Sequence, residues 1–102
     1  MSGGGRVRVL IFAVADAEGV ERAYHEISTA LRGTPGLLGN ELLREFGPAA
    51  GTFAVMSEWA SREAFHDWEQ GREHRDVTAP LRPYQDTSRD RPFGLYEVVA
   101  RY

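Results

Sequence analysis

The stretch SEWASREAFHDWEQGREH, residues 57–74, concentrates the side chains of this chain that could do chemistry. Five of them are aromatic or can carry a proton near neutral pH: Trp59, Phe65, His66, Trp68 and His74. Indole and phenyl rings can line a dry pocket for a flat ligand, and an imidazole can act as a general base. The same pattern also fits the core-facing side of an ordinary helix.

The histidines of this stretch differ in their expected positions. On the expected helix His66 lies one position from the apolar Phe65, roughly 100° around the axis, so it is predicted to face solvent. His74 follows Gly71, where the helix is expected to end and the chain to turn. His74 is therefore the histidine predicted to reach a pocket, with a plain surface position as the alternative.

Several classes of chemistry lack support in the sequence. The chain has no cysteine, which excludes disulfides, thiolate metal sites and a cysteine nucleophile. No pair of histidines shows metal-ligand spacing, and we expect no metal site. No serine lies in a nucleophile-elbow context, and no glycine-rich phosphate loop follows a strand. We therefore expect neither an acyl-transfer hydrolase nor a common nucleotide-binding fold.

Length, charge and hydropathy further limit the kind of protein that this sequence can encode. The 102 residues suffice for one domain, which we place at residues 6–102 after a flexible segment at residues 1–5. The formal net charge of −3 argues against nucleic-acid binding. No stretch approaches the roughly 20 apolar residues of a membrane span, and the first residues lack a signal-peptide pattern. We expect a cytoplasmic protein that binds neither nucleic acid nor membrane.

Alternating strands and helices are predicted to position these side chains. Strands are predicted at residues 6–16, 37–46, 52–59 and 93–102, and helices at residues 17–32 and after Ser61. Asp16 and Ser61 are the predicted N-caps. Residues 37–46 also fit a helix, but the Pro-Gly pair before them is turn chemistry and favours a strand. A further short helix and a polar loop are predicted within residues 72–91.

The order β-α-β-β-α-β predicts a ferredoxin-like α+β fold, a four-stranded antiparallel sheet with both helices on one face. Residues 9–15 are apolar without interruption, which predicts burial of the first strand on both faces. The helices can cover only one face, so the other would expose some of Leu10, Phe12 and Val14. We therefore predict a homodimer in which two copies pack sheet against sheet.

Two polar residues outside the opening stretch are further candidates for a pocket. Asn40 is polar in an otherwise apolar strand, which fits either an edge position or a hydrogen bond to a ligand. Tyr84 could supply a phenolic donor.

Three segments resemble the antibiotic biosynthesis monooxygenase family: TPGLLGNELLRE, TFAVMSEWASREAFHDWEQGREH and the terminal LYEVV. The most specific features are the strand-end Glu-Trp, the Ser-x-Glu-Ala-Phe start of the helix, and the Trp68 and His74 that follow. The resemblance runs from about Val7 to Arg101 and implies a dimeric α+β barrel. This agrees with the homodimer predicted from the first strand.

The family divides by chemistry. One branch oxidises polyketide-type phenols to quinones with O₂ and no metal or flavin, using a strand-end Trp, an Asn four residues earlier and a helix Tyr. Trp59 matches this Trp, whereas Val55 and Phe65 stand in the other two places. A second branch degrades haem with a helix Trp, an axial His and a first-strand Asn. Trp68 matches its Trp, His74 lies a few residues early, and the first strand has no Asn.

The resemblance implies a small monooxygenase that oxidises a hydrophobic, polyketide-type aromatic substrate without a cofactor, in a cavity between sheet and helices. The predicted catalytic residues are His74, as general base, and Trp68. The predicted substrate-binding residues are Trp59, Phe65, Tyr84 and Asn40. One alternative is a haem-binding or haem-degrading protein with His74 as axial ligand. The other is a non-catalytic dimeric domain that binds a ligand.

Overall fold

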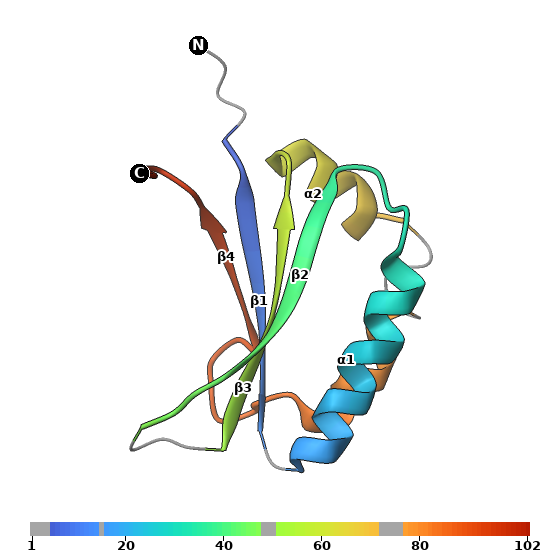
Figure 1. Cartoon of the computed structure of the whole chain (residues 1–102), viewed down its shortest axis with the longest axis vertical. Coiled ribbons are helices and arrows are strands. Elements are labelled where there is room, and N and C mark those ends of the chain that lie inside the picture. The colour runs from blue at the N-terminus through green and yellow to red at the C-terminus, as the bar shows by residue number, and fades with distance from the viewer. Residues whose placement is uncertain (1–4, 15, 48–50, 72–76) are drawn as a thin grey trace.

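In the part of the chain that the structure describes, the fold contains four strands, two α-helices and a short 3₁₀ helix (Figure 1). A computed structural model of the chain describes residues 5–14, 16–47, 51–71 and 77–102. The strands are β1 (Val7–Val14), β2 (Leu37–Arg44), β3 (Thr52–Trp59) and β4 (Phe93–Glu97). The helices are α1 (Ala17–Leu31) and α2 (Arg62–Glu69), and the 3₁₀ helix η1 (Ala79–Tyr84) precedes β4. This is the predicted ferredoxin-like α+β order.

The strands form one antiparallel sheet in the order β2-β3-β1-β4. β1 pairs along its whole length with β3, so that Val7 lies opposite Trp59 and Val14 opposite Thr52. Its first part pairs with β4 on the other side. Because directly opposed residues share a face, the odd-numbered residues of β1, β3 and β4 lie on one side of the sheet and the even-numbered ones on the other.

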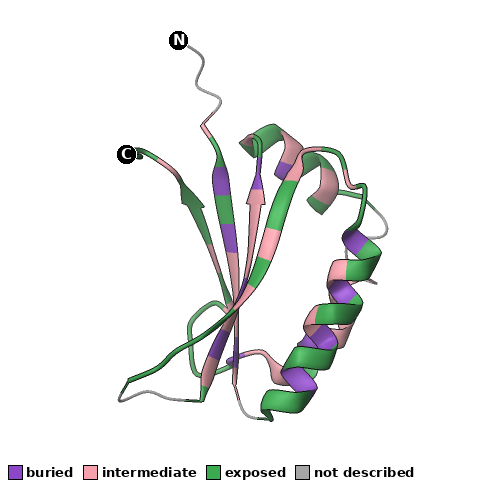
Figure 2. Ribbon diagram, in the orientation of Figure 1, coloured by how far each residue is buried: buried purple, intermediate pink, exposed green. Residues whose placement is uncertain are grey.

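Both α-helices cover the face that carries the odd-numbered residues, and they lie to the same side of the strands in Figure 1. The buried side of α1 repeats at helical spacing: Val20, Ala23, Ile27 and Leu31. These residues pack against Ala13, Phe53, Val55 and Leu81. Figure 2 shows the buried positions recurring along α1. Full burial of one such large apolar side chain contributes about 1.5–3 kcal/mol, so this layer sets where α1 lies.

The two predicted N-caps have different outcomes. The Ser61 prediction is confirmed, because its hydroxyl accepts the Ala64 N–H at 3.1 Å at the start of α2. The Asp16 prediction is wrong in its chemistry. Asp16 occupies the N-cap position of α1, but its side chain makes no capping hydrogen bond, and its backbone carbonyl accepts the Val20 N–H at 3.0 Å. The buried side of α1 therefore holds this helix in place without a side-chain cap.

The ambiguous segment after Gly36 is a strand, as predicted. β2 pairs with β3, with an irregularity in register between Leu37 and Gly39. Gly36 has a φ of 82°, a conformation that glycine adopts without strain, and it turns the chain into β2.

The last strand is shorter than predicted. β4 ends at Glu97 instead of running to residue 102, because its partner β1 begins at Val7, directly opposite Glu97. One more backbone hydrogen bond follows, from the Val98 N–H to the Arg6 carbonyl at 2.9 Å. Tyr102 beyond it is fully exposed.

Some predictions fall outside the described residues. These are the first four residues of the expected flexible segment and residues 72–76, which include His74. The predicted short helix of the 72–91 region is present as η1 within the described part. Among the helices of the described residues, none is long and apolar enough to cross a membrane.

The second face of the sheet is covered by neither α-helix. It carries a row of apolar side chains from all four strands: Leu10, Phe12, Leu43, Ala54, Met56 and Tyr96. Leu43 and Tyr96 remain 40% and 54% exposed. We call these six residues the open face.

Candidate active site

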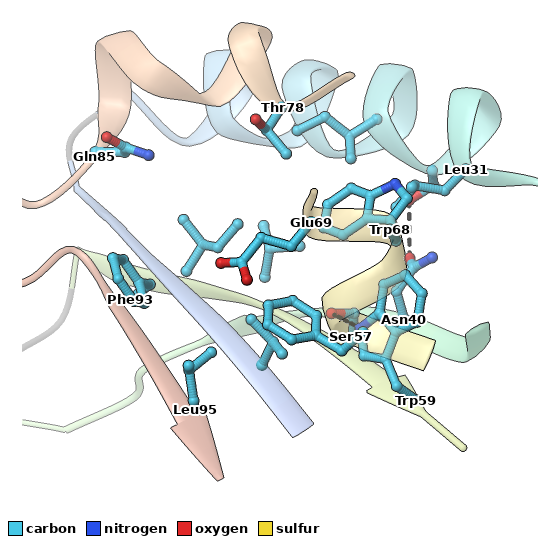
Figure 3. Close-up of a pocket in the computed structure, with 16 residues that line it drawn as sticks. Leu31, Asn40, Ser57, Trp59, Trp68, Glu69, Thr78, Gln85, Phe93 and Leu95 are labelled. Carbon is cyan, nitrogen blue, oxygen red and sulfur yellow. Dashed lines mark hydrogen bonds between the residues drawn. The ribbon is translucent and has the colours of Figure 1, made fainter. Parts of the chain in front are cut away.

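A cavity of about 150 Å³ lies between the helix-covered face of the sheet and helices α1 and α2 (Figure 3). All four strands and both α-helices contribute to its wall, which is largely apolar. Its polar side chains are few: Ser28, Asn40, Ser57, Glu69, Thr78 and Gln85. A concave apolar space with a small number of converging polar groups is typical of a small-molecule site.

Three aromatic rings form one continuous wall of this cavity. The Trp59 ring, fully buried at the end of β3, lies 5.2 Å from the Trp68 ring and 5.8 Å from the Phe65 ring, centroid to centroid. Phe65 and Trp68 are three residues apart on α2, which puts them on one side of that helix, 6.2 Å apart. All three separations lie in the range where aromatic rings attract one another.

Ser57 fixes the orientation of the buried indole. The Trp59 Nε1–H group donates to Ser57 Oγ at 2.9 Å. The two residues are two positions apart on β3 and therefore point to the same face. The hydrogen bond satisfies a polar group that would otherwise be buried without a partner, and it leaves the flat face of the indole to pack against Trp68.

Asn40 lies beside Ser57 on the neighbouring strand β2 and is held there by α1 (Figure 3). Ser28 Oγ donates to Asn40 Oδ1 at 2.8 Å, and the Tyr24 hydroxyl donates to the Asn40 backbone carbonyl at 3.3 Å. With Oδ1 engaged by Ser28, the Asn40 amide nitrogen is the group that can donate to a ligand in the cavity.

Glu69, the last residue of α2, brings a carboxylate to the cavity. It is the one ionisable side chain among the described residues that line this space (Figure 3). Its side chain is 41% exposed, and Oε1 lies 3.3 Å from Nδ1 of His66 one turn earlier. The carboxylate therefore contacts both the apolar interior and solvent.

The cavity opens along β4. Phe93 and Leu95 lie on its wall yet remain 41% and 51% exposed, because the helices do not extend over this edge strand. Ligand atoms can enter or protrude between these two side chains.

A second hollow of about 230 Å³ adjoins the first at Val9, Phe65 and Leu95. Its wall also contains Arg62, whose guanidinium forms a 2.8 Å ion pair with the Glu97 carboxylate of β4. A ligand too long for the first cavity can continue into this more polar space.

A tight loop places Gln85 at the far end of the cavity. The Asp86 N–H donates to the Phe12 carbonyl, and its carboxylate accepts from Ser88 and from Arg89 Nε at 3.1 Å. The hydrogen bond from the Ser88 hydroxyl, with a smaller contribution from Arg89, holds the pKa of the Asp86 carboxyl below its usual range, against the opposing effect of burial. The charged carboxylate thus anchors the loop.

The structure brings most of the predicted site residues together. Trp59, Phe65, Trp68 and Asn40 all line the cavity. Tyr84 does not: it packs against α1 at Gly19 and belongs to the core beneath η1. His74, the predicted base, lies outside the described residues.

Sequence reasoning missed Ser28, Ser57 and Glu69 as site residues. Ser57 carried a usable signal, because a polar residue two positions before a buried strand-end Trp shares its face. Ser28 carried a weaker one, one position after the buried Ile27 of α1. Glu69 was grouped with the solvent-facing acids of α2, but it lies one position after Trp68 at the end of this helix and reaches the cavity.

No cluster of three or more potential metal ligands occurs among the residues that the structure describes.

The sequence profile of the antibiotic biosynthesis monooxygenase family matches residues 13–79, which is more than half of the chain. The chain belongs to this family. The matched segment contains α1, β2, β3 and α2. A comparison of the sequence with curated proteins found no match.

Several solved structures share the fold of this antibiotic biosynthesis monooxygenase family member. A mutant of SnoaB, a cofactor-independent oxygenase from Streptomyces nogalater, superposes with a TM-score of 0.76 at 18% identity over 97% of both chains. Unmutated SnoaB gives 0.72 at 20% identity over 98% of this chain and 96% of its own. The haem-degrading protein Rv3592 from Mycobacterium tuberculosis, in a haem-free form, gives 0.66 at 22% identity over 95% and 98%.

Proposed function

We propose that the protein is a cofactor-independent monooxygenase that oxidises a phenolic aromatic substrate in the cavity between sheet and helices. The observation that carries this proposal is the continuous wall of Trp59, Phe65 and Trp68 around an apolar space with few polar groups. The family membership and the fold shared with SnoaB support it.

Such a site accelerates oxidation by what it does to the substrate. Loss of a proton leaves an electron-rich phenolate, which can pass electrons to O₂. One oxygen atom then enters the substrate, where a CH₂ becomes a carbonyl, and the other leaves as water. The protein excludes water, orients the ring against the aromatic wall and stabilises the developing anion with donors such as the Asn40 amide.

The volume of the cavity limits what fits inside. An engineered apolar cavity of about 150 Å³ in another protein accepts benzene, so this cavity accepts the reactive ring of a substrate. The remaining rings of a polyketide-type molecule would extend past Phe93 and Leu95 or into the adjoining hollow.

Both tryptophans of the chain line the cavity, which allows binding and turnover to be measured separately. We expect dithranol, a tricyclic phenolic anthrone, to quench the intrinsic fluorescence and to be converted to its quinone with uptake of O₂. Trp68→Ala should reduce the rate about tenfold or more, a change of about 1.4 kcal/mol in the barrier. Glu63→Gln, an exposed change on the same helix, is the control.

The outcomes separate the proposal from its alternatives. Quenching without O₂ uptake would support the non-catalytic ligand-binding domain instead. Turnover that is equal in the wild type and in Trp68→Ala would contradict a reaction in this cavity. The predicted role of His74 as base is tested in the same assay by His74→Gln.

Haem degradation is the second candidate because Rv3592 shares the fold. The described residues fit haem poorly: none of those lining the cavity carries a His, Cys, Met or Tyr side chain that could ligate iron. Haemin added to the purified protein tests this candidate. A shifted Soret band that is lost in His74→Ala would favour haem over the proposal.

We also infer that the functional unit is a homodimer joined through the open face. The open face supports this because a contiguous apolar surface on one side of a sheet usually marks an interface.

A further inference from the structure

We propose that Glu69 is the general base that takes the phenolic proton of the substrate; this rests on the proposed function. Among the described residues that line the cavity, Glu69 alone has an ionisable side chain, and a carboxylate can accept a proton from a phenol. The other polar lining residues are amides and hydroxyls, which can donate or accept hydrogen bonds but remain neutral.

The dipole of α2 does not favour a carboxylate at the position of Glu69, although Glu69 also pairs with His66 three residues earlier. A carboxylate in the last turn of a helix faces the negative end of the helix dipole and is locally unfavourable. Glu69 also follows Trp68 directly. The same turn of α2 therefore fixes the positions of both the Trp68 ring in the aromatic wall and the Glu69 carboxylate. Its side chain contacts the cavity instead of extending only into solvent (Figure 3).

The surroundings of Glu69 suit a base that must also return its proton. The side chain is 41% exposed, so water reaches it at the mouth of the cavity. On its own helix, His66 Nδ1 lies 3.3 Å from Oε1. From the strands and from α1, the facing groups that line the cavity are uncharged among the described residues. One oxygen of the carboxylate is thus held at the rim by His66.

The step is a simple proton transfer. The O–H bond of the phenol breaks, its hydrogen forms a bond to a Glu69 carboxylate oxygen, and the electron pair stays on the phenolate oxygen. The neutral acid that results no longer repels the phenolate. It then loses its proton to water at the mouth, which restores the carboxylate for the next turnover.

A ligand whose ionisation is visible tests the contact without any catalysis. p-Nitrophenol has one ring, which suits the cavity, and its phenolate absorbs in the visible range. A nearby carboxylate accepts a hydrogen bond from the neutral phenol and repels the phenolate, so it raises the pKa of the bound ligand. We expect that pKa to be higher in the wild type than in Glu69→Gln, and unchanged by Glu63→Gln, an exposed acid of the same helix.

Turnover of dithranol gives the second measurement. Glu69→Gln should lower kcat by about 10²–10⁴-fold, the usual effect of removing a general base, while KM changes little. Glu69→Asp, which keeps the carboxylate, should restore part of the rate.

The outcomes separate this inference from the proposed function. If p-nitrophenol binds with the same pKa in the wild type and in Glu69→Gln, Glu69 is not the base, although the cavity can still be the site. Full turnover by Glu69→Gln together with loss of turnover in His74→Gln would also overturn the inference. If p-nitrophenol fails to quench the tryptophan fluorescence at all, the inference and the proposed function both fall.

Discussion

At the scale of single residues, the site depends on pairs that lie on one face of an element. Ser57 holds Trp59 from two positions away on a strand, and Trp68 lies against Trp59 from the end of α2. The tryptophans could be identified as pocket candidates from the sequence, because a large ring at a strand end or on the apolar side of a helix must pack in the core or line a cavity. The partners could not, since a serine beside a buried indole looks like any other serine until the strand register is known.

Removing the Ser57 hydroxyl tests one of these pairs. Ser57→Ala leaves the Trp59 N–H buried without an acceptor, and we expect a loss of about 1–3 kcal/mol in the free energy of unfolding, measured by urea denaturation. In the background of Trp59→Phe, which has no N–H group, Ser57→Ala should cost much less. Equal losses in the two backgrounds would show that the hydrogen bond does not stabilise the fold.

At the scale of elements, hydrophobic periodicity and the turn and cap residues predicted the order of strands and helices. Strand pairing determines where the strands begin and end. β2 follows its Pro-Gly turn as predicted, and α2 begins at the Ser61 cap. β4 stops at Glu97, which lies opposite Val7, the first residue of β1, and a sequence read one segment at a time does not show this pairing. The placement of Tyr84 was missed for a similar reason: its contact is with α1, more than sixty residues earlier.

That contact between η1 and α1 depends on the absence of a side chain at Gly19. A Cβ at Gly19 would lie 2.6 Å from Tyr84 Cζ, which is too close for two carbon atoms. Alanine favours a helix over glycine by about 1 kcal/mol, yet we expect Gly19→Ala to lower the melting temperature because the tyrosine ring must move. Gly39→Ala is the matched control, since a Cβ there would meet no atom within 4 Å. A Gly19→Ala variant as stable as the wild type would show that the contact between Tyr84 and α1 can accommodate an extra methyl group.

At the scale of the whole molecule, the two faces of the sheet have different surroundings. One face, with its helices, forms the cavity, and the open face lies on the opposite side, where neither α-helix covers it and the Arg89 guanidinium lies over the Phe12 ring. The first strand serves both, because Val9 and Ile11 line the cavity and Leu10 and Phe12 point the other way. This is why an uninterrupted apolar first strand could be interpreted from the sequence as a strand buried on both faces.

A charge on the open face should therefore separate two copies without disturbing the cavity. Leu10 lies at the centre of β1, and burying a glutamate there against a second sheet would cost several kcal/mol. We expect the wild type to have the mass of a dimer by gel filtration with light scattering, and Leu10→Glu to have the mass of a monomer. Ala17→Glu adds the same charge at an exposed position of α1 and should remain a dimer.

Because Leu10 points away from the aromatic wall, Leu10→Glu should still bind p-nitrophenol. A wild type that elutes as a monomer at micromolar concentration, or a Leu10→Glu variant that stays dimeric, would show that the open face is not the interface.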